Sequence, residues 1–207
     1  VVDLSRLQAA EVLIDPELVD IEAVVDEALD NVRVAASAKD IALADKCGED
    51  LYVLGDRGLL VTAVRNLVGN AISYSPDGTK VGVGARLVGD QIEITVTDQG
   101  PGIPQEEQGR IFERFYRIDE ARSRATGGTG LGLTICDRLV GAMNGRWELS
   151  SVVGKGSTFA FSVPLQEISP AAEPVAALYE EGKIGHVGAF PALEARAQRM
   201  AQEGGFA

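Results

Sequence analysis

Apolar residues recur at a helical spacing in three stretches of the chain. Residues 22–38 carry one apolar side, and residues 57–74 repeat apolar positions at steps of three and four more clearly. This spacing is typical of a helix with one buried face. A shorter stretch, 131–143, shows the same pattern directly after a Gly-Thr-Gly run. The pattern therefore predicts three helices of this kind.

Between these stretches the pattern changes to alternation, which is typical of strands because successive side chains point to opposite faces. Two of the alternating runs flank Gly89-Asp90 and predict a hairpin. Strands outnumber helices and several are joined by hairpins, so we expect an α/β fold with a mixed sheet covered by helices on one face. The predicted strands are 41–44, 51–54, 80–87, 91–98, 147–151 and 158–163.

The composition changes after Leu165, where the run SPAAEPVAA is rich in Pro and Ala and the run GKIGHVGAF is loose. Such composition predicts a flexible tail over 166–207, with a packed helix over 191–202 as the alternative. At the other end, residues 3–13 resemble the end of a helix that Asp15-Pro16 stops. The patterned region between them is 16–165.

Charge and residue counts exclude several classes of function. The net charge of −12 disfavours nucleic-acid binding, which needs clustered Lys and Arg. No stretch approaches the roughly 18 apolar residues of a membrane helix. The cysteines, Cys47 and Cys136, lack metal-type spacing, and His186 is the single histidine. Zinc sites and Ser-His-Asp catalysis are therefore disfavoured by count.

Two asparagines share one face of the second predicted helix. Asn66 and Asn70 lie four residues apart, and Tyr74 continues the same face beside the apolar stripe. Asparagine is a poor helix former because its amide competes with the backbone, so two amides near a buried seam need partners. An amide oxygen suits Mg²⁺, and an amide NH₂ can donate to a phosphate oxygen. The alternative is a pair of ordinary buried or capping asparagines.

The strand ITVTD ends with a carboxylate on its apolar parity, because Ile94, Val96 and Asp98 share one face. A buried carboxylate needs hydrogen-bond donors. The exocyclic amine of adenine is such a donor, whereas guanine places an acceptor there. Gly100 and Gly102 then allow close approach of the backbone to a base, or the start of a mobile segment. A strand-end aspartate in a tight turn is the alternative interpretation.

Glycines open the third predicted helix in GGTGLGLTI, residues 127–135, where backbone N–H groups can face phosphates. This run matches neither the dinucleotide fingerprint nor the Walker A loop. The preceding residues, 110–124, hold five arginines against three acidic residues. Arginines on a mobile loop suit a triphosphate, with a solvated charged face as the alternative. Phe112 and Phe115 are expected to pin this loop to the body.

Jointly these elements resemble the ATP-binding catalytic domain of sensor histidine kinases, in the gyrase and histidine-kinase ATPase superfamily. The resemblance covers about residues 3–165, including the closing GKGSTFAFSVPL, and the runs LLVTAVRNLVGNAISYSP and ARSRATGGTGLGL look most like phosphate-responsive sensor kinases of actinobacteria. It implies a two-layer α/β sandwich with ATP between helices and a lid. The motifs, in order, are N-x-x-x-N-A at 66–71, D-x-G-x-G at 98–102, F-x-x-F at 112–115 and G-x-G-x-G at 128–132.

The resemblance also implies roles for single residues. Asn70 would coordinate Mg²⁺ with Asn66 assisting, and Asp98 would bind the adenine amine with support from Thr158. The glycines after Asp98 would hinge the lid, and two arginines of the lid would contact phosphates. The predicted ATP-binding residues are Asn66, Asn70, Tyr74, Asp98, Gly100, Gly102, Ile103, Arg117, Arg122, Gly128, Thr129, Gly130, Leu131, Gly132, Leu133 and Thr158.

Asn66 bears on the reaction. Related hydrolysing ATPases carry a Glu four residues before the magnesium Asn to activate water, and an amide cannot act as that base. We therefore expect a catalytic module that binds Mg-ATP and transfers the γ-phosphate to a histidine, for relay to a response regulator. The alternatives are a nucleotide-binding regulatory domain without phosphotransfer, a related hydrolysing ATPase, and a Rossmann oxidoreductase.

Two departures from the family pattern affect this expectation. Ser73 stands where the family often has Lys or His, and His186 is not in a helical context. The phosphoacceptor is therefore expected on an upstream helical hairpin, whose end DLSRLQAAE resembles. The predicted organisation is the end of that hairpin with a linker over 1–15, the catalytic domain over 16–165 and the tail over 166–207. The full-length protein is expected to be a homodimer, and this chain the cytoplasmic part of a membrane-bound sensor.

Overall fold

The computed structural model describes residues 17–118 and 130–165. The three predicted helices are present as α2 (Ile21–Ala38), α3 (Arg57–Tyr74) and α5 (Gly132–Ala142). The side chain of Asp20 caps α2 by accepting the N–H of Glu22 at 3.0 Å, and Asp56 caps α3 through Leu59 in the same way. Helix α5 has no side-chain cap. Within the described residues, its first N–H groups therefore donate no hydrogen bond to the side chain of the N-cap residue Leu131.

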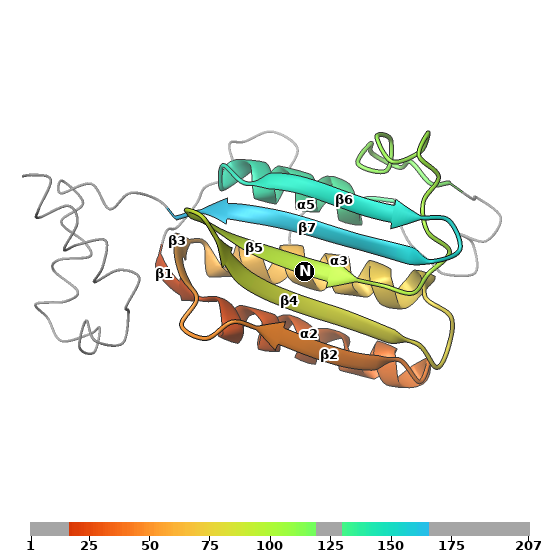
Figure 1. The fold of residues 1–207 in the computed structure, drawn as a ribbon, viewed down its shortest axis with the longest axis horizontal. Coiled ribbons are helices and arrows are strands. Elements are labelled where there is room, and N and C mark those ends of the chain that lie inside the picture. The colour runs from red at the N-terminus through yellow and green to blue at the C-terminus, as the bar shows by residue number, and fades with distance from the viewer. Residues whose placement is uncertain (1–16, 119–129, 166–207) are drawn as a thin grey trace, which may run out of the picture. The chain divides into compact units, whose positions relative to one another are not determined.

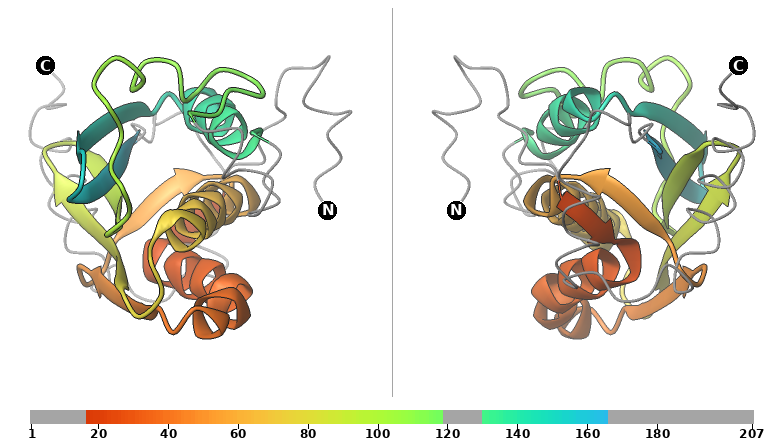
Figure 2. Two further views of the ribbon diagram at one scale, coloured as in Figure 1. Left: turned by 90° about the vertical axis from the view of Figure 1, so that its right-hand side faces the viewer. Right: turned by 90° about the vertical axis from the view of Figure 1, so that its left-hand side faces the viewer.

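Five strands form the main sheet, in the order β2-β4-β5-β7-β6. The β2–β4 pair is parallel and the other pairs are antiparallel, so the sheet is mixed. The helices lie behind the sheet in Figure 1, and the end-on views of Figure 2 show that they cover one face of it. The predicted fold class is confirmed. The strands are β2 (Ala42–Cys47), β4 (Lys80–Val88), β5 (Gln91–Thr97), β6 (Arg146–Val152) and β7 (Gly156–Pro164).

A second, two-stranded sheet pairs β1 (Glu17–Asp20) with β3 (Tyr52–Gly55). Strand β1 was not predicted; its four residues lie between Asp15-Pro16 and the first predicted helix, and two of them, Glu17 and Asp20, are acidic. The strand leads directly into α2, and its pairing with β3 places the start of α2 beside the loop before β3. The N–H of Ile21 donates to the carbonyl of Leu51 at 3.0 Å, which fixes this junction.

The core lies between the main sheet and the helices. Ile92, Ile94 and Val96 of β5 are almost completely buried, as the alternating pattern predicted. They pack with one continuous cluster that includes Leu60 and Leu67 of α3. Helix α3 packs against both α2 and α5 and therefore occupies the centre of the helical layer (Figure 1). The predicted site residues of α3 consequently lie beside α5 and the ends of the central strands.

Candidate functional site

Asp98 follows β5 directly and continues its buried face, with 8% of its surface exposed. Two backbone N–H groups donate to one carboxylate oxygen, Oδ1: that of Gly100 at 2.7 Å and that of Ser157 at 3.2 Å. Burial raises the pKa of Asp98 above its ordinary value, and the two N–H groups oppose that rise. The carboxylate is thus held in place at the end of the core.

The glycines after Asp98 are required by close contacts. A Cβ on Gly100 would lie 2.9 Å from Asp98 Oδ1 and 3.2 Å from the carbonyl oxygen of Tyr74. Gly102 has a φ of +71°, and its Cβ would lie 2.2 Å from the carbonyl oxygen of Val152. The backbone at these glycines is packed closely against the end of α3 and the β6–β7 hairpin, and their role as a hinge stays a prediction.

Ser157, rather than Thr158, supports Asp98. The Oγ1 of Thr158 lies 3.1 Å from that of Thr97, its cross-strand partner on the exposed face of the sheet. Ser157 is one residue earlier and therefore on the other face, where its N–H reaches Asp98 and its carbonyl accepts the N–H of Asp98 at 2.8 Å. The prediction for Thr158 was off by one residue because the register of β5 and β7 cannot be read from the sequence.

The face of α3 that carries Asn66, Asn70 and Tyr74 meets the start of α5. A Cβ on Gly132 would lie 3.6 Å from Asn70 Nδ2 and 3.7 Å from Oδ1, so this amide faces the first turn of α5. Tyr74 is 51% exposed, and its carbonyl adjoins Gly100. With a rise of about 1.5 Å per residue, Asn70 lies roughly 6 Å along α3 from this carbonyl. The predicted residues therefore line an elongated region from Asp98 to α5.

Asn66 has a partner that the sequence did not indicate. Its side chain lies close enough to the thiol of Cys136 on α5 to lower the pKa of that thiol, and Cys136 Sγ donates to the carbonyl oxygen of Ala63 at 3.5 Å. Burial is the larger effect and raises the pKa of Cys136 to about 12. The thiol is therefore neutral and unreactive.

The start of α5 presents backbone donors to this region. Leu131 occupies the N-cap position without a side-chain hydrogen bond, and the first turn contains no acidic residue. Gly130, at a φ of +69°, and the helical residues Gly132 and Leu133 complete the turn. A helix start of this kind favours an anion. The predicted residues Arg122, Gly128 and Thr129 lie outside the described residues.

The segment 104–118 is attached at one of the two predicted aromatic positions. Phe112 packs against Trp147 with ring centroids 5.5 Å apart, and its carbonyl accepts a hydrogen bond from Thr134 Oγ1 at 2.9 Å. Phe115 is 70% exposed and does not pin the segment through its ring. Its N–H instead donates to the carbonyl of Gly130 at 3.0 Å. Arg117 and Ile103 are half-buried.

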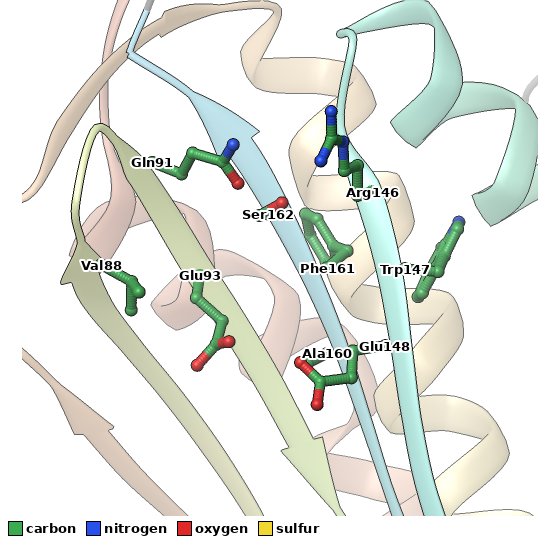
Figure 3. Close-up of a pocket in the computed structure, with 9 residues that line it drawn as sticks. All are labelled: Val88, Gln91, Glu93, Arg146, Trp147, Glu148, Ala160, Phe161 and Ser162. Atoms are coloured by element: carbon green, nitrogen blue, oxygen red, sulfur yellow. The ribbon is translucent and has the colours of Figure 1, made fainter.

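Two pockets adjoin the main sheet. The larger one, of about 350 Å³, is lined by residues of β4 to β7 and contains none of the predicted site residues (Figure 3). Its lining mixes acidic side chains with Arg146, as expected of a solvated sheet surface. A smaller hollow of about 160 Å³ adjoins Asp98 and includes Lys155 in its lining. The described residues contain no helix that is long and apolar enough to cross a membrane.

This fold and this site define a class of protein. Residues 55–167 match the family described as histidine kinase-, DNA gyrase B-, and HSP90-like ATPase, and the chain belongs to this family. The predicted resemblance is confirmed.

The similar proteins narrow the class to sensor histidine kinases. The chain is 52% identical over 163 residues to the sensor-like histidine kinase SenX3 of Mycolicibacterium smegmatis, covering 79% of this chain and 42% of that protein. It is 40% identical over 120 residues to the sensor histidine kinase WalK of Bacillus subtilis, covering 57% of this chain and 20% of that protein. The chain therefore spans less than half the length of these relatives. Its domain is a histidine-kinase-type catalytic ATP-binding domain.

Solved structures of histidine kinases are similar to this chain in fold. The structure of full-length ShkA in complex with AMPPNP has a TM-score of 0.68 and 31% identity, covering 77% of this chain and 33% of that one. The mycobacterial sensor histidine kinase MprB has a TM-score of 0.64 and 33% identity, covering 72% of this chain and 97% of that one.

Proposed function

We propose that this domain binds Mg-ATP and transfers the γ-phosphate to a histidine on a helical hairpin upstream, for relay to the aspartate of a response regulator. Because the chain is similar to sensor histidine kinases, we also propose that the full-length protein is a homodimer with this domain on the cytoplasmic side of a membrane. The observation that carries the proposal is the buried Asp98, whose Oδ1 accepts two backbone N–H groups. Such a carboxylate can accept the exocyclic amine of adenine through its other oxygen.

The base and the phosphates would bind at opposite ends of the elongated region. With adenine at Asp98, the triphosphate would extend along α3 towards Asn70 and the uncapped start of α5. The amide of Asn70 would donate to, or share a metal with, the phosphate oxygens. Arg117, Arg122 and the glycines at 128–132 would complete the phosphate end.

The amide oxygens of Asn70 and Asn66 are suitable ligands for magnesium. Among the residues that the structure describes, no group of three or more His, Cys, Asp and Glu side chains is arranged to hold a metal. Mg²⁺ commonly keeps several waters and binds through few protein oxygens plus phosphates, so the oxygen of Asn70, assisted by Asn66, suffices as an anchor. When bound, Mg²⁺ would neutralise charge on the transferring phosphoryl group.

Phosphotransfer is favoured over hydrolysis at this site. Asn66 occupies the position where a hydrolysing relative needs a general base, and its neighbour on α5 is the neutral thiol of Cys136. Neither group can remove a proton from water near neutral pH. The side chains would therefore hold ATP in place, and an incoming histidine would supply the nucleophile.

The test combines binding and transfer. The chain is incubated with γ-labelled ATP, Mg²⁺ and the matching upstream hairpin, and acid-labile phosphohistidine is measured. We expect label on the hairpin, and Asn70→Ala should remove most of the Mg²⁺ dependence of ATP binding. Ser73→Ala is the matched control, since Ser73 lies on the same turn and its exposed hydroxyl bonds only the carbonyl of Gly69 among the described contacts. ATP binding without transfer would support the regulatory alternative.

A further inference from the structure

Ser151, near the end of β6, lies at the centre of a polar cluster beside Asp98. Its Oγ accepts the N–H of Ile103 at 2.8 Å. The same Oγ lies 3.2 Å from the carbonyl oxygen of Gly156 and 3.0 Å from the Oγ of Ser157. The half-buried side chain of Ser151 thus contacts Ile103, which is distant in the sequence, and two residues across the β6–β7 hairpin, Gly156 and Ser157.

The donors and acceptors of this cluster can be assigned by counting. A serine hydroxyl has one hydrogen and two lone pairs. The carbonyl of Gly156 can only accept, so the hydrogen of Ser151 is used there, and the N–H of Ile103 takes one lone pair. The second lone pair must accept the hydrogen of Ser157. Ser151 is then fully hydrogen-bonded, and the Ser157 hydroxyl keeps both lone pairs for a donor.

The cluster joins the two backbone segments that hold Asp98. One segment contains Gly100 and continues to Ile103, and the other is Gly156–Ser157. Both segments contact Ser151, although the first begins the long segment that follows β5 and the second begins β7. This hydroxyl is therefore one of the contacts that set the spacing between the two N–H groups that reach Asp98 Oδ1.

Other contacts hold the same segments without Ser151 Oγ. The N–H of Gly154 donates to the carbonyl of Pro101 at 2.7 Å. The Nε2 of Gln108 donates to the carbonyl of Ile103 at 3.0 Å. Loss of the hydroxyl is thus expected to loosen the position of the carboxylate while the hairpin remains folded.

We propose that Ser151 is a positioning residue for the base of the bound nucleotide: it fixes the Asp98 carboxylate, through Ile103 and Ser157, in the orientation that accepts the exocyclic amine of adenine. This inference rests on the proposed binding of ATP. It adds that discrimination for the amine depends on a side chain that does not touch the base.

The test compares ATP with purine riboside triphosphate, which lacks the 6-amino group. Calorimetric titration at fixed Mg²⁺ is made with the full chain and with Ser151→Ala, Ser151→Thr and Ser150→Ala. We expect Ser151→Ala to weaken ATP binding about tenfold, comparable to one hydrogen bond, and to change the affinity for the analogue less than about twofold. Ser151→Thr keeps the hydroxyl and should restore the preference. Ser150, exposed on the opposite face of β6, is the control and should behave as wild type.

Each result has a distinct meaning. Equal weakening of both nucleotides in Ser151→Ala, or an unchanged preference for ATP, overturns the positioning role. If the wild-type chain itself binds the analogue as tightly as ATP, the assignment of Asp98 to adenine fails, and the inference fails with it. Thermal unfolding of each variant, measured without nucleotide, checks that the variant is folded, so that the ratios of the two affinities can be compared.

Discussion

At the scale of single residues, the buried carboxylate of Asp98 lowers the stability of the folded protein at neutral pH. Its folded-state pKa is raised by burial, so the folded protein binds this proton more tightly than the unfolded chain. The resulting penalty is absent at pH values below the ordinary pKa of Asp, where both states are protonated, and complete above the raised value. A charge that costs stability at neutral pH is a candidate for function.

Asp98→Asn separates these two effects. The amide oxygen can still accept the N–H groups of Gly100 and Ser157, so the variant should be at least as stable as wild type at pH 7, with a difference that shrinks in acid. ATP affinity should fall by about 10- to 100-fold, because a charged acceptor is lost. Thermal unfolding from pH 3 to 8 and calorimetric titration measure the two quantities.

The wild-type affinity for ATP should itself fall as the pH drops through the raised pKa of Asp98, and the variant should lose this dependence. Asp90→Asn, at the exposed tip of the β4–β5 hairpin, is the control and should keep the wild-type profile. A variant at position 98 with unchanged ATP affinity would reassign the base contact.

At the scale of elements, helix α3 depends on a cation from α2. The last turn of α3 contains no basic residue. Lys39 Nζ, at the C-cap of α2, instead donates to two carbonyls of the last turn of α3, those of Ile72 at 2.9 Å and Ser73 at 3.2 Å, and to that of the C-cap residue Ser75 at 2.6 Å. A positive charge at a helix C-terminus is favourable, and these bonds satisfy groups that a helix end leaves open.

Lys39→Met should therefore lower the free energy of unfolding by about 1–3 kcal/mol, most of it from the lost carbonyl contacts. The ion pair of Lys39 with the exposed Asp77, at 3.8 Å, adds little. Arg33→Met removes an exposed ion pair with Asp30 from the same helix and should change stability by less than about 0.5 kcal/mol. Urea unfolding compares the two, and equal effects would contradict the capping role.

The approach of residues 100–103 to the β6–β7 hairpin makes a second prediction for an element. Gly102 and Gly78 have similar φ values, +71° and +73°, but a Cβ would lie 2.2 Å from the Val152 carbonyl oxygen at Gly102 and meet nothing within 4 Å at Gly78. Gly78→Ala should cost about 1–2 kcal/mol for its backbone conformation. Gly102→Ala should cost about 3 kcal/mol or more. Similar urea midpoints for Gly102→Ala and Gly78→Ala would show that the β6–β7 hairpin moves to make room for the added methyl group.

At the scale of the whole molecule, the features predicted from the sequence are those with a local signal. The periodicity of α3 and the alternation of β5 are properties of neighbouring residues; the first gave the bounds of α3, and the second gave those of β5 to within one residue. The motif order indicated the family, and the structure brings Asn70 and Gly132 together as expected. Strand β1 was missed because its position depends on pairing with β3, which lies more than thirty residues further along the chain.

The contacts that were missed join residues far apart in the chain. Thr158 was predicted and Ser157 was not, because only the pairing of β5 with β7 decides which residue adjoins Asp98. The proximity of Asn66 to Cys136 and the cluster at Ser151 likewise depend on how separate elements meet. No local pattern marks such residues, so the sequence could indicate the region of the site but not its supporting contacts.

The order of strands in the main sheet has a consequence for synthesis of the chain. Strand β7 is the last strand of the described residues, yet it lies between β5 and β6 and supplies the N–H of Ser157 to Asp98. While β7 is still inside the ribosome, β5 and β6 have no common neighbour, and the carboxylate lacks one of its two donors. The arrangement around Asp98 is therefore completed only when β7 has inserted between two strands that were made before it.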